Sequence, residues 1–427
     1  MQVAQSWLAS PYHLLIRTSL ALAVGVGFSL GLYLVLGFAF GLPLAATSPA
    51  LVEVHGQVQV FGFVGLFIMA VAVQLVPRFH ASRMAHPTQV SVGGLLLAAG
   101  LILRLVGQPL LPGVPLRATL LVLSGIFELV GVLLAVHTFA LLIGRGVTPP
   151  RGWEALLPAT LGGSLVLALV LNLVACLELA QGALVVPYAL DEALLHLEVW
   201  GFASTMVLAI SGRVFPKFLL LQPTRAHLAR AALGLWAVGS FGVPLVWLVF
   251  EGTPALRFMA ALAQFGGAVL FVTALRLYDP AARESGTPHI TNPTRRWVRL
   301  AYALMLTAAA ANLGIAAADF LGRTSTVAEL SGARHLVAQG FLLPMIQLMA
   351  ARILPGYSGH MLKRGRLLGA LLWSLLAGAA LRGGAELAGG YAPGWSAAVA
   401  LGGTLTAGAF VVFAVGLWRS TNPPLRA

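Results

Sequence analysis

Apolar stretches of about 20 residues recur from one end of this 427-residue chain to the other. Each stretch is long enough to cross a hydrocarbon core of roughly 30 Å as a helix. Backbone amides in lipid must be hydrogen-bonded within the protein, and a helix achieves this within one segment. Only 9% of the residues are charged, whereas soluble proteins contain about 25%. The sequence therefore predicts an all-α polytopic membrane protein.

The apolar stretches define twelve candidate spans and no soluble domain, so that residues 1–427 are expected to form a single transmembrane domain. The spans are 15–41, 56–78, 90–111, 118–143, 154–180, 196–220, 227–250, 255–277, 296–320, 335–356, 366–390 and 395–418.

Basic residues gather in alternate connections between these spans, and acidic residues fall mostly in the others. The positive-inside rule makes the basic connections cytoplasmic, and with an even number of spans both termini are expected in the cytoplasm. The net charge of +13 is therefore explained by topology and does not indicate nucleic-acid binding. The single cysteine, Cys176, excludes an internal disulfide and a multi-cysteine metal site.

Three segments of the sequence align with one another and indicate an internal repeat. Each contains Gly-Phe, a proline 15 residues after the glycine and an aromatic residue two further on, and the glycines lie 139 residues apart both times. The residues are Gly62, Pro77 and Phe79; Gly201, Pro216 and Phe218; and Gly340, Pro355 and Tyr357. We predict three four-helix repeats, 12–145, 151–280 and 294–420, around a pseudo-threefold axis.

Spans 2, 6 and 10 each carry a histidine near the predicted outer face: His55, His196 and His335. These spans run in the same direction, so the three imidazoles are expected at one membrane depth. Imidazole is a common ligand for haem iron and for copper, and the three histidines are the predicted metal ligands. His196 and His335 precede their glycine by five residues and His55 by seven, with Gln57 at the five-before position. Interfacial histidines bonded to a carbonyl or to water are the alternative.

Other ionisable residues within the spans are functional candidates by default. Arg104 and Arg382 lie on the outer side of equivalent spans, where an arginine pairs well with haem propionates. Glu128 fits a structural hydrogen bond and a proton path equally well. The histidines among basic loop residues, such as His80, are expected to be solvated.

Twelve spans with histidines on the second, sixth and tenth resemble the catalytic subunit of haem–copper oxidases and nitric oxide reductases. The motifs more closely resemble NnrS, a family of haem- and copper-containing membrane proteins linked to the bacterial nitric oxide response. Its second span reads like H-x-H-E-M-L-F-G-F, and here "HGQVQVFGF" keeps His55, Phe61, Gly62 and Phe63. In its tenth span, His335, Gly340, Arg352, Gly356, Ser358 and Gly359 match.

This resemblance implies a b-type haem held by His55 and His335, a copper-like role for His196, and the bacterial cytoplasmic membrane. Nitric oxide, a quinol and a soluble redox protein are the implied partners besides lipid. Gln57 stands where the family has its second histidine, Tyr357 replaces a later one, and Val337 stands where oxidases have a ligand. A complete binuclear reductase centre is therefore not expected, and whether the protein is an enzyme stays open.

Two other functions fit the same scaffold. The first is a metal-free transporter or channel in which the histidines line a proton or substrate path; the sequence lacks the paired mid-membrane helix breaks typical of transporters. The second is a quinol-linked electron-transfer subunit, whose soluble redox domain would belong to a separate chain.

Overall fold

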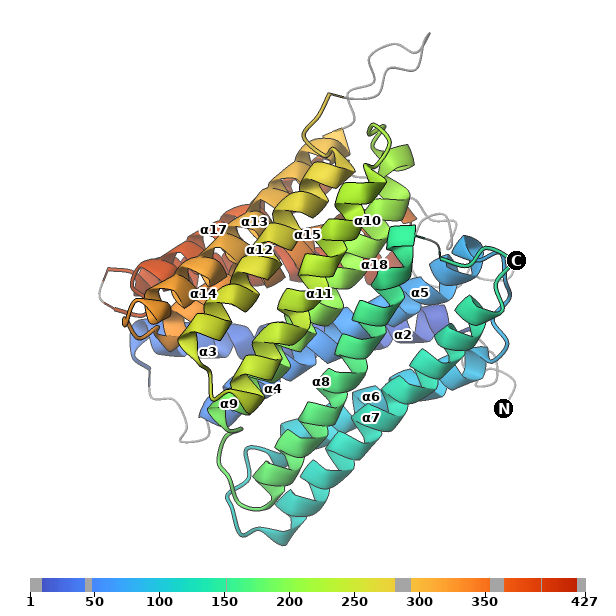
Figure 1. Ribbon diagram of the computed structural model, residues 1–427. Helices are drawn as coiled ribbons and strands as arrows, with labels where there is room; N and C mark the ends of the chain where they lie inside the picture. Colours follow the sequence, from blue (N-terminus) through green and yellow to red (C-terminus); the bar gives the residue numbers. More distant parts are fainter. Residues whose placement is uncertain are drawn as a thin grey trace. The chain divides into compact units, whose positions relative to one another are not determined.

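The computed structural model describes residues 10–42, 48–150, 152–280, 293–353, 365–392 and 394–420, and its regular elements in these ranges are all helical (Figure 1). They form twelve long helical segments, of which eleven are long and apolar enough to span a membrane. The remaining segment is formed by α14, η5 and α15. The predicted all-α membrane protein with twelve helices is confirmed.

Several of the twelve segments consist of more than one helical element. In chain order, the elements are α2 (Pro11–Leu22), η1 (Ala23–Phe28) and α3 (Ser29–Phe40); α4 (Ser48–Gln57), η2 (Val58–Gly65) and α5 (Leu66–Phe79); α6 (Pro87–Gly107); α7 (Pro115–Gly144); η3 (Gly152–Ala155) and α8 (Leu156–Ala180); α9 (Tyr188–His196), η4 (Leu197–Ser204) and α10 (Thr205–Phe218); α11 (Ala226–Val249); α12 (Pro254–Leu275); α13 (Pro293–Phe320); α14 (Val327–Val337), η5 (Ala338–Leu342) and α15 (Leu343–Ile353); α17 (Gly365–Ala388); and α18 (Ser396–Ser420).

The helices that carry the three histidines begin earlier than the hydropathy of the sequence predicts. Their first two turns are less apolar than the helix that follows but are still helical. In addition, α14 begins with a capping box in which the Thr326 hydroxyl accepts from the Glu329 amide at 3.2 Å. As a result, His55 is the eighth residue of α4, while His196 and His335 are the ninth residues of α9 and α14. The three imidazoles therefore lie about two turns inside their helices.

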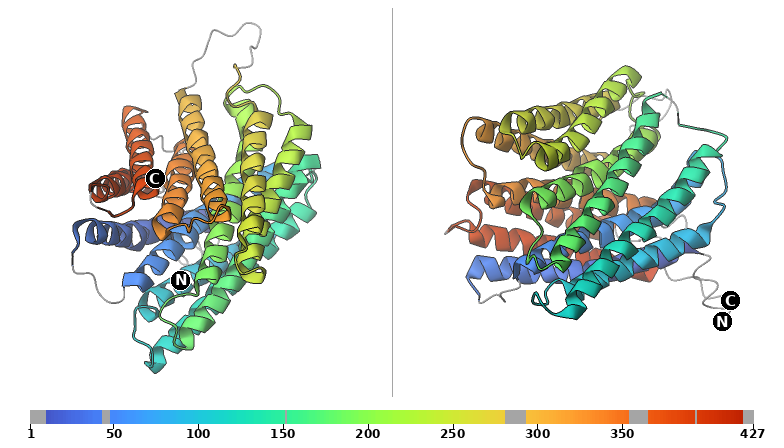
Figure 2. Two further views of the ribbon diagram at one scale, coloured as in Figure 1. Left: turned by 60° about the vertical axis from the view of Figure 1, so that its left-hand side comes forward. Right: turned by 60° about the horizontal axis from the view of Figure 1, so that its bottom comes forward.

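The chain forms two compact units. Within one of them, the yellow-green α11 and the yellow α12 lie side by side in both views of Figure 2. One comprises Met1–Gly37, Pro43–Arg151 and Leu161–Glu198, and the other comprises Phe38–Leu42, Gly152–Thr160 and Val199–Ala427. Antiparallel pairs dominate the packing within each unit: α6 against α7 in the first, and α11 against α12 and α17 against α18 in the second.

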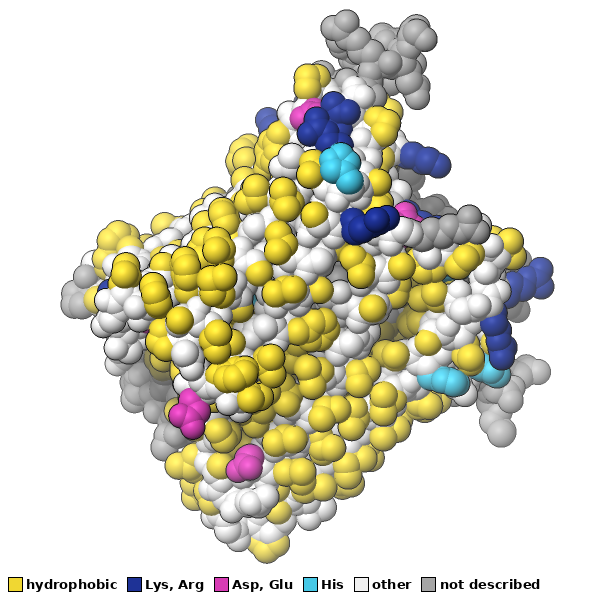
Figure 3. Space-filling model, viewed as in Figure 1, with side chains coloured by type: hydrophobic (Ala, Val, Ile, Leu, Met, Phe, Trp, Pro, Cys, Tyr) yellow, Lys and Arg dark blue, Asp and Glu magenta, His cyan; other side chains and the backbone are white. Residues whose placement is uncertain are grey.

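Exposed side chains along the helices are mainly hydrophobic, and the Lys and Arg side chains on the viewed face lie at helix ends (Figure 3). On α7 the exposed stripe follows helical spacing and consists of Leu123, Ile126, Val130 and Leu133. Ser124 and Glu128 lie on the buried face of the same helix. Apolar groups outside and polar groups inside are the arrangement that contact with lipid requires.

The helices with the predicted repeat glycines are each interrupted by a π-helical segment. Gly62 lies in η2, Gly201 in η4 and Gly340 in η5. Such segments frequently occur at functional sites, where the wider turn reorients side chains. Pro355 and Tyr357, the later residues of the third motif, lie outside the described residues.

Candidate functional site: two buried polar networks and three histidines

His55 is half-buried on α4, and its ring is oriented by the first span. Its Nδ1 lies 2.8 Å from the carbonyl oxygen of Gly27. A carbonyl only accepts hydrogen bonds, so Nδ1 carries the proton and a neutral ring has its lone pair on Nε2. Metal-bound histidines usually have this arrangement, in which the second nitrogen donates to a protein oxygen.

The His55 ring occupies space that only a glycine at position 31 leaves open. A Cβ at residue 31 would overlap Cε1 of the imidazole and lie 2.9 Å from its Nδ1. Gly27, one turn earlier, faces Gln59 in the same way, with Cδ of that side chain 2.8 Å from the position of a Cβ. Gly27 and Gly31 of the first span therefore leave the space that two polar side chains of the second span, Gln59 and His55, occupy.

Replacing Gly31 by alanine is expected to displace the His55 ring. The clash should destabilise the protein by about 1–3 kcal/mol, the usual cost of overpacking, and lower its melting temperature in detergent. Gly25→Ala is the matched control, because no atom lies within 4 Å of a Cβ at that position. Adding His55→Ala to Gly31→Ala should restore stability, and a double variant no more stable than Gly31→Ala would contradict this packing.

His196 is half-buried at the end of α9, which packs against the end of α4 within the first unit. Leu195 lies 3.9 Å from the position of a Cβ at Gly56, and the Gln57 amide donates to Oε1 of Glu198 at 2.7 Å. Both Gln57 and Glu198 are buried. The structure thus brings the helix ends that carry His55 and His196 side by side, and Gln57 bonds to a carboxylate two residues after His196.

His335 on α14 contacts a buried carboxylate of α17 within the second unit. Its Nδ1 lies 2.6 Å from Oε2 of Glu386, whose side chain has no exposed surface. Ser331 donates to the same carboxylate oxygen at 3.3 Å, and Nε of Arg382 donates to Oε1 at 3.1 Å. Since an ionised carboxylate accepts, the neutral His335 ring also has its lone pair on Nε2.

Arg382 also lies near Tyr391, which follows α17. Burial raises the pKa of the Tyr391 phenol, and the charge of Arg382 opposes this rise. In this polar network of the second unit, the Arg382 guanidinium therefore lies between the Glu386 carboxylate and the Tyr391 phenol.

Arg104 on α6 is fully buried in the centre of a polar network in the first unit. Its Nε donates to Oε1 of Gln108 at 2.8 Å, and its Nη1 donates to Asn172. Gln108 in turn donates to Glu53, which accepts from the Val186 amide at 2.9 Å. The guanidinium bonds that the structure assigns to Arg104 therefore go to protein amides.

Glu128 completes this network from α7. Its two carboxylate oxygens accept from Ser124 at 2.8 Å and from Asn172 at 3.1 Å. His137 lies on the same helix but is exposed, as expected for residues nine positions apart. The network extends from the Val186 loop to the middle of α7.

Four further members of these networks were not predicted from the sequence: Glu386, Glu198, Gln108 and Asn172. One signal was available: Gln108 and Glu386 each follow a noted arginine by four residues, a spacing that brings helical side chains together. The partners of Glu198 and Asn172 come from distant parts of the chain, and local spacing does not reveal them.

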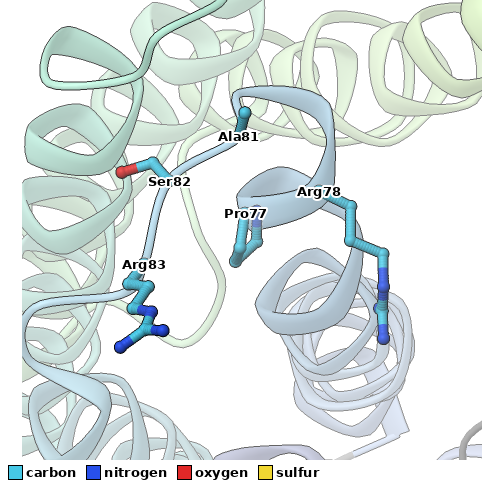
Figure 4. Close-up of a pocket in the computed structure, with 5 residues that line it drawn as sticks. All are labelled: Pro77, Arg78, Ala81, Ser82 and Arg83. Atoms are coloured by element: carbon cyan, nitrogen blue, oxygen red, sulfur yellow. The ribbon is translucent and has the colours of Figure 1, made fainter.

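The prediction that His80 is solvated is wrong. Its side chain is buried and its Nδ1 lies 2.7 Å from the Thr148 carbonyl oxygen, so His80 fastens the α5–α6 connection to the α7–α8 connection. An open hollow of about 330 Å³ adjoins it and is lined by Pro77, Arg78, Ala81, Ser82 and Arg83 (Figure 4). This hollow begins 22 residues beyond His55 along the chain, roughly 30 Å at helical rise.

Within the described ranges, no group of three or more His, Cys, Asp or Glu side chains is arranged to hold a metal ion. Haem iron needs only one or two protein ligands, so a cluster of three is not required. A single histidine with a fixed ring orientation can provide one of them. The ring orientations of His55 and His335 fit such a role.

Comparison with known proteins identifies one family. No curated protein matches the sequence significantly. The family model described as NnrS protein matches residues 17–421, which is nearly the whole chain and includes all three histidines. The chain therefore belongs to the NnrS family.

Proposed function

We propose that this NnrS-family protein binds haem b in the membrane, and that His55 and His335 would hold its iron. The observation that carries the proposal is the fixed tautomer of both rings: each Nδ1 donates to a protein oxygen, at 2.8 Å from Gly27 and at 2.6 Å from Glu386. The lone pair of each neutral ring is then on Nε2, as in metal-bound imidazoles. His196, beside His55 at the packed ends of α4 and α9, is proposed as a copper ligand.

A haem held by these histidines would supply one-electron chemistry or a binding site for nitric oxide. We propose a role in the bacterial nitric oxide response or in electron transfer, in the cytoplasmic membrane with both termini inside. A quinol or a soluble redox protein would exchange the electrons. The residues of the chain orient the imidazoles and hold their protons on Nδ1.

We also propose that the twelve helices derive from three repeats. The support is local: Gly62, Gly201 and Gly340 each lie in a π-helical segment, and each segment follows the histidine of its helix. The same arrangement three times, with histidines eight or nine residues from the helix start, is unexpected for unrelated helices.

The proposal is tested by absorption spectra of protein purified in detergent after expression with added haem precursor. The wild-type protein should show a Soret band and a sharp α-band on reduction. His335→Ala should remove or convert this spectrum, because an axial ligand is lost, and His55→Ala should do so as well. His137→Ala is the matched control, since that exposed imidazole lies on the lipid-facing side of α7.

Two outcomes would contradict the proposal. A wild-type protein without a haem spectrum would favour the metal-free transporter or channel. A haem spectrum that remains unchanged in both His55→Ala and His335→Ala would show that other residues bind the iron. Reduction of the bound haem by a quinol would support the quinol-linked role.

A further inference from the structure

Glu386 is the buried acceptor on which three side chains converge. Oε2 accepts from His335 and Ser331, and Oε1 accepts from Arg382. The His335 contact, at 2.6 Å, is the shortest of the three. Burial of the carboxylate strengthens this bond, because no water competes for the oxygen and the local dielectric constant is low.

The two candidate haem ligands therefore differ in their second hydrogen bond. His55 donates to the neutral carbonyl of Gly27, whereas His335 donates to the carboxylate of Glu386. A hydrogen bond to an ionised acceptor is roughly twice as strong as one to a neutral acceptor. It shifts electron density from the N–H bond into the ring, so that Nε2 of His335 becomes the stronger donor.

The first unit provides an internal comparison, because Arg104 holds Gln108 with the same atoms and spacing. Nε of Arg104 donates to Oε1 of a residue four positions on, and Nε of Arg382 does the same. The acceptor is the neutral Gln108 in one network and Glu386 in the other. The position five before the repeat glycine is Gln57 in the first case and His335 in the second. The two equivalent positions thus hold two amides in the first unit, where Gln57 donates to Glu198 instead, and a histidine with its carboxylate partner in the second unit.

We infer that Glu386 is a positioning residue that sets the donor strength of His335 toward a bound metal, with Arg382 holding the carboxylate in place. This rests on the proposed haem function and deepens it. A stronger donor stabilises the oxidised iron, so Glu386 lowers the reduction potential of the site. Arg382 moderates the effect, because it withdraws part of the carboxylate charge through Oε1.

The inference is tested by redox titration of Glu386→Gln beside Glu128→Gln. Both variants remove one buried carboxylate, but only Glu386 contacts a candidate ligand. Glu386→Gln should keep the haem and shift its midpoint potential upward, while Glu128→Gln should leave the potential near the wild-type value. An upward shift confined to Glu386→Gln is a change that a merely structural role would not produce, because both variants lose one buried carboxylate.

Ser331→Ala is a second variant, useful if Glu386→Gln does not fold. It removes a hydroxyl that donates to Oε2 of Glu386 and also lies 3.2 Å from Nδ1 of His335. Without this hydroxyl, the hydrogen bond from Nδ1 goes to the carboxylate alone and becomes stronger. The midpoint potential should then shift downward, opposite to Glu386→Gln. Haem-loaded variants with an unchanged midpoint potential would overturn this inference and leave the haem proposal intact. A wild-type protein that binds no haem would overturn both.

Discussion

Replacing Gly131 by leucine is expected to prevent correct folding of the first unit. Gly93 on α6 and Gly131 on α7 cross with their backbones in contact: a Cβ on either would overlap the carbonyl oxygen of the other, and a Cβ at Gly131 would lie 2.9 Å from the Leu97 amide nitrogen. Backbone atoms cannot move aside as a flexible side chain does. Small residues permit such close crossings in membranes, where packing and not hydrophobicity drives association.

The measurement is the yield of monodisperse protein by size-exclusion chromatography, followed by its melting temperature in detergent. Gly131→Leu should give aggregated protein or none. Gly144→Leu is the matched control on the same helix, since no atom lies within 4 Å of a Cβ there. If Gly131→Leu yields monodisperse protein with a wild-type melting temperature, the described crossing of α6 and α7 is wrong.

Replacing Arg104 by methionine should cause the second large loss. The Arg104 guanidinium is fully buried, and its charge faces the carboxylates of Glu128, Glu53 and Glu198. Methionine preserves much of the volume but leaves buried negative groups without their cation. Breaking a buried charge network in this way costs about 3–5 kcal/mol, which should appear as a clear fall in melting temperature.

A double variant separates the charge of Arg104 from its packing. Adding Glu128→Gln to Arg104→Met removes one of the stranded carboxylates, so part of the lost stability should return. Arg145→Met, which removes an exposed arginine of the same unit, should have little effect. A double variant less stable than Arg104→Met would show that Arg104 acts through packing and not through charge.

The helices could be predicted from the sequence because lipid imposes a simple length and composition rule. Their starts were less accurate. α9 and α14 extend about two turns before their apolar stretches, because the capping box at Thr326 and the acidic first turn of α9 are helical as well as polar. Hydropathy marks the lipid-crossing part of a helix, and the helix itself continues into the interface.

The site was predictable only in part. The three histidines and the two arginines were singled out by their place in a repeated sequence pattern, and their role as a cofactor site stays a prediction. The structure describes oriented rings at His55 and His335. The π-helical segments were not found, because a wider turn is selected by the packing of neighbouring helices. His80 was misjudged for a similar reason, since its partner Thr148 lies 68 residues away. Gln57 was predicted only to replace a ligand of the family. Its hydrogen bond to Glu198 was not predicted, because the two residues lie 141 positions apart in the sequence.

The central claim is that this NnrS-family chain holds haem b through His55 and His335. It is tested most directly by haem quantification, as the pyridine haemochrome, in purified wild-type protein and in the variant with both histidines replaced by alanine. We expect a stoichiometric amount of haem b in the wild type and none in the double variant, while His137→Ala retains the wild-type content. A colourless wild-type protein expressed with ample haem, or a double variant with undiminished haem, would contradict the account.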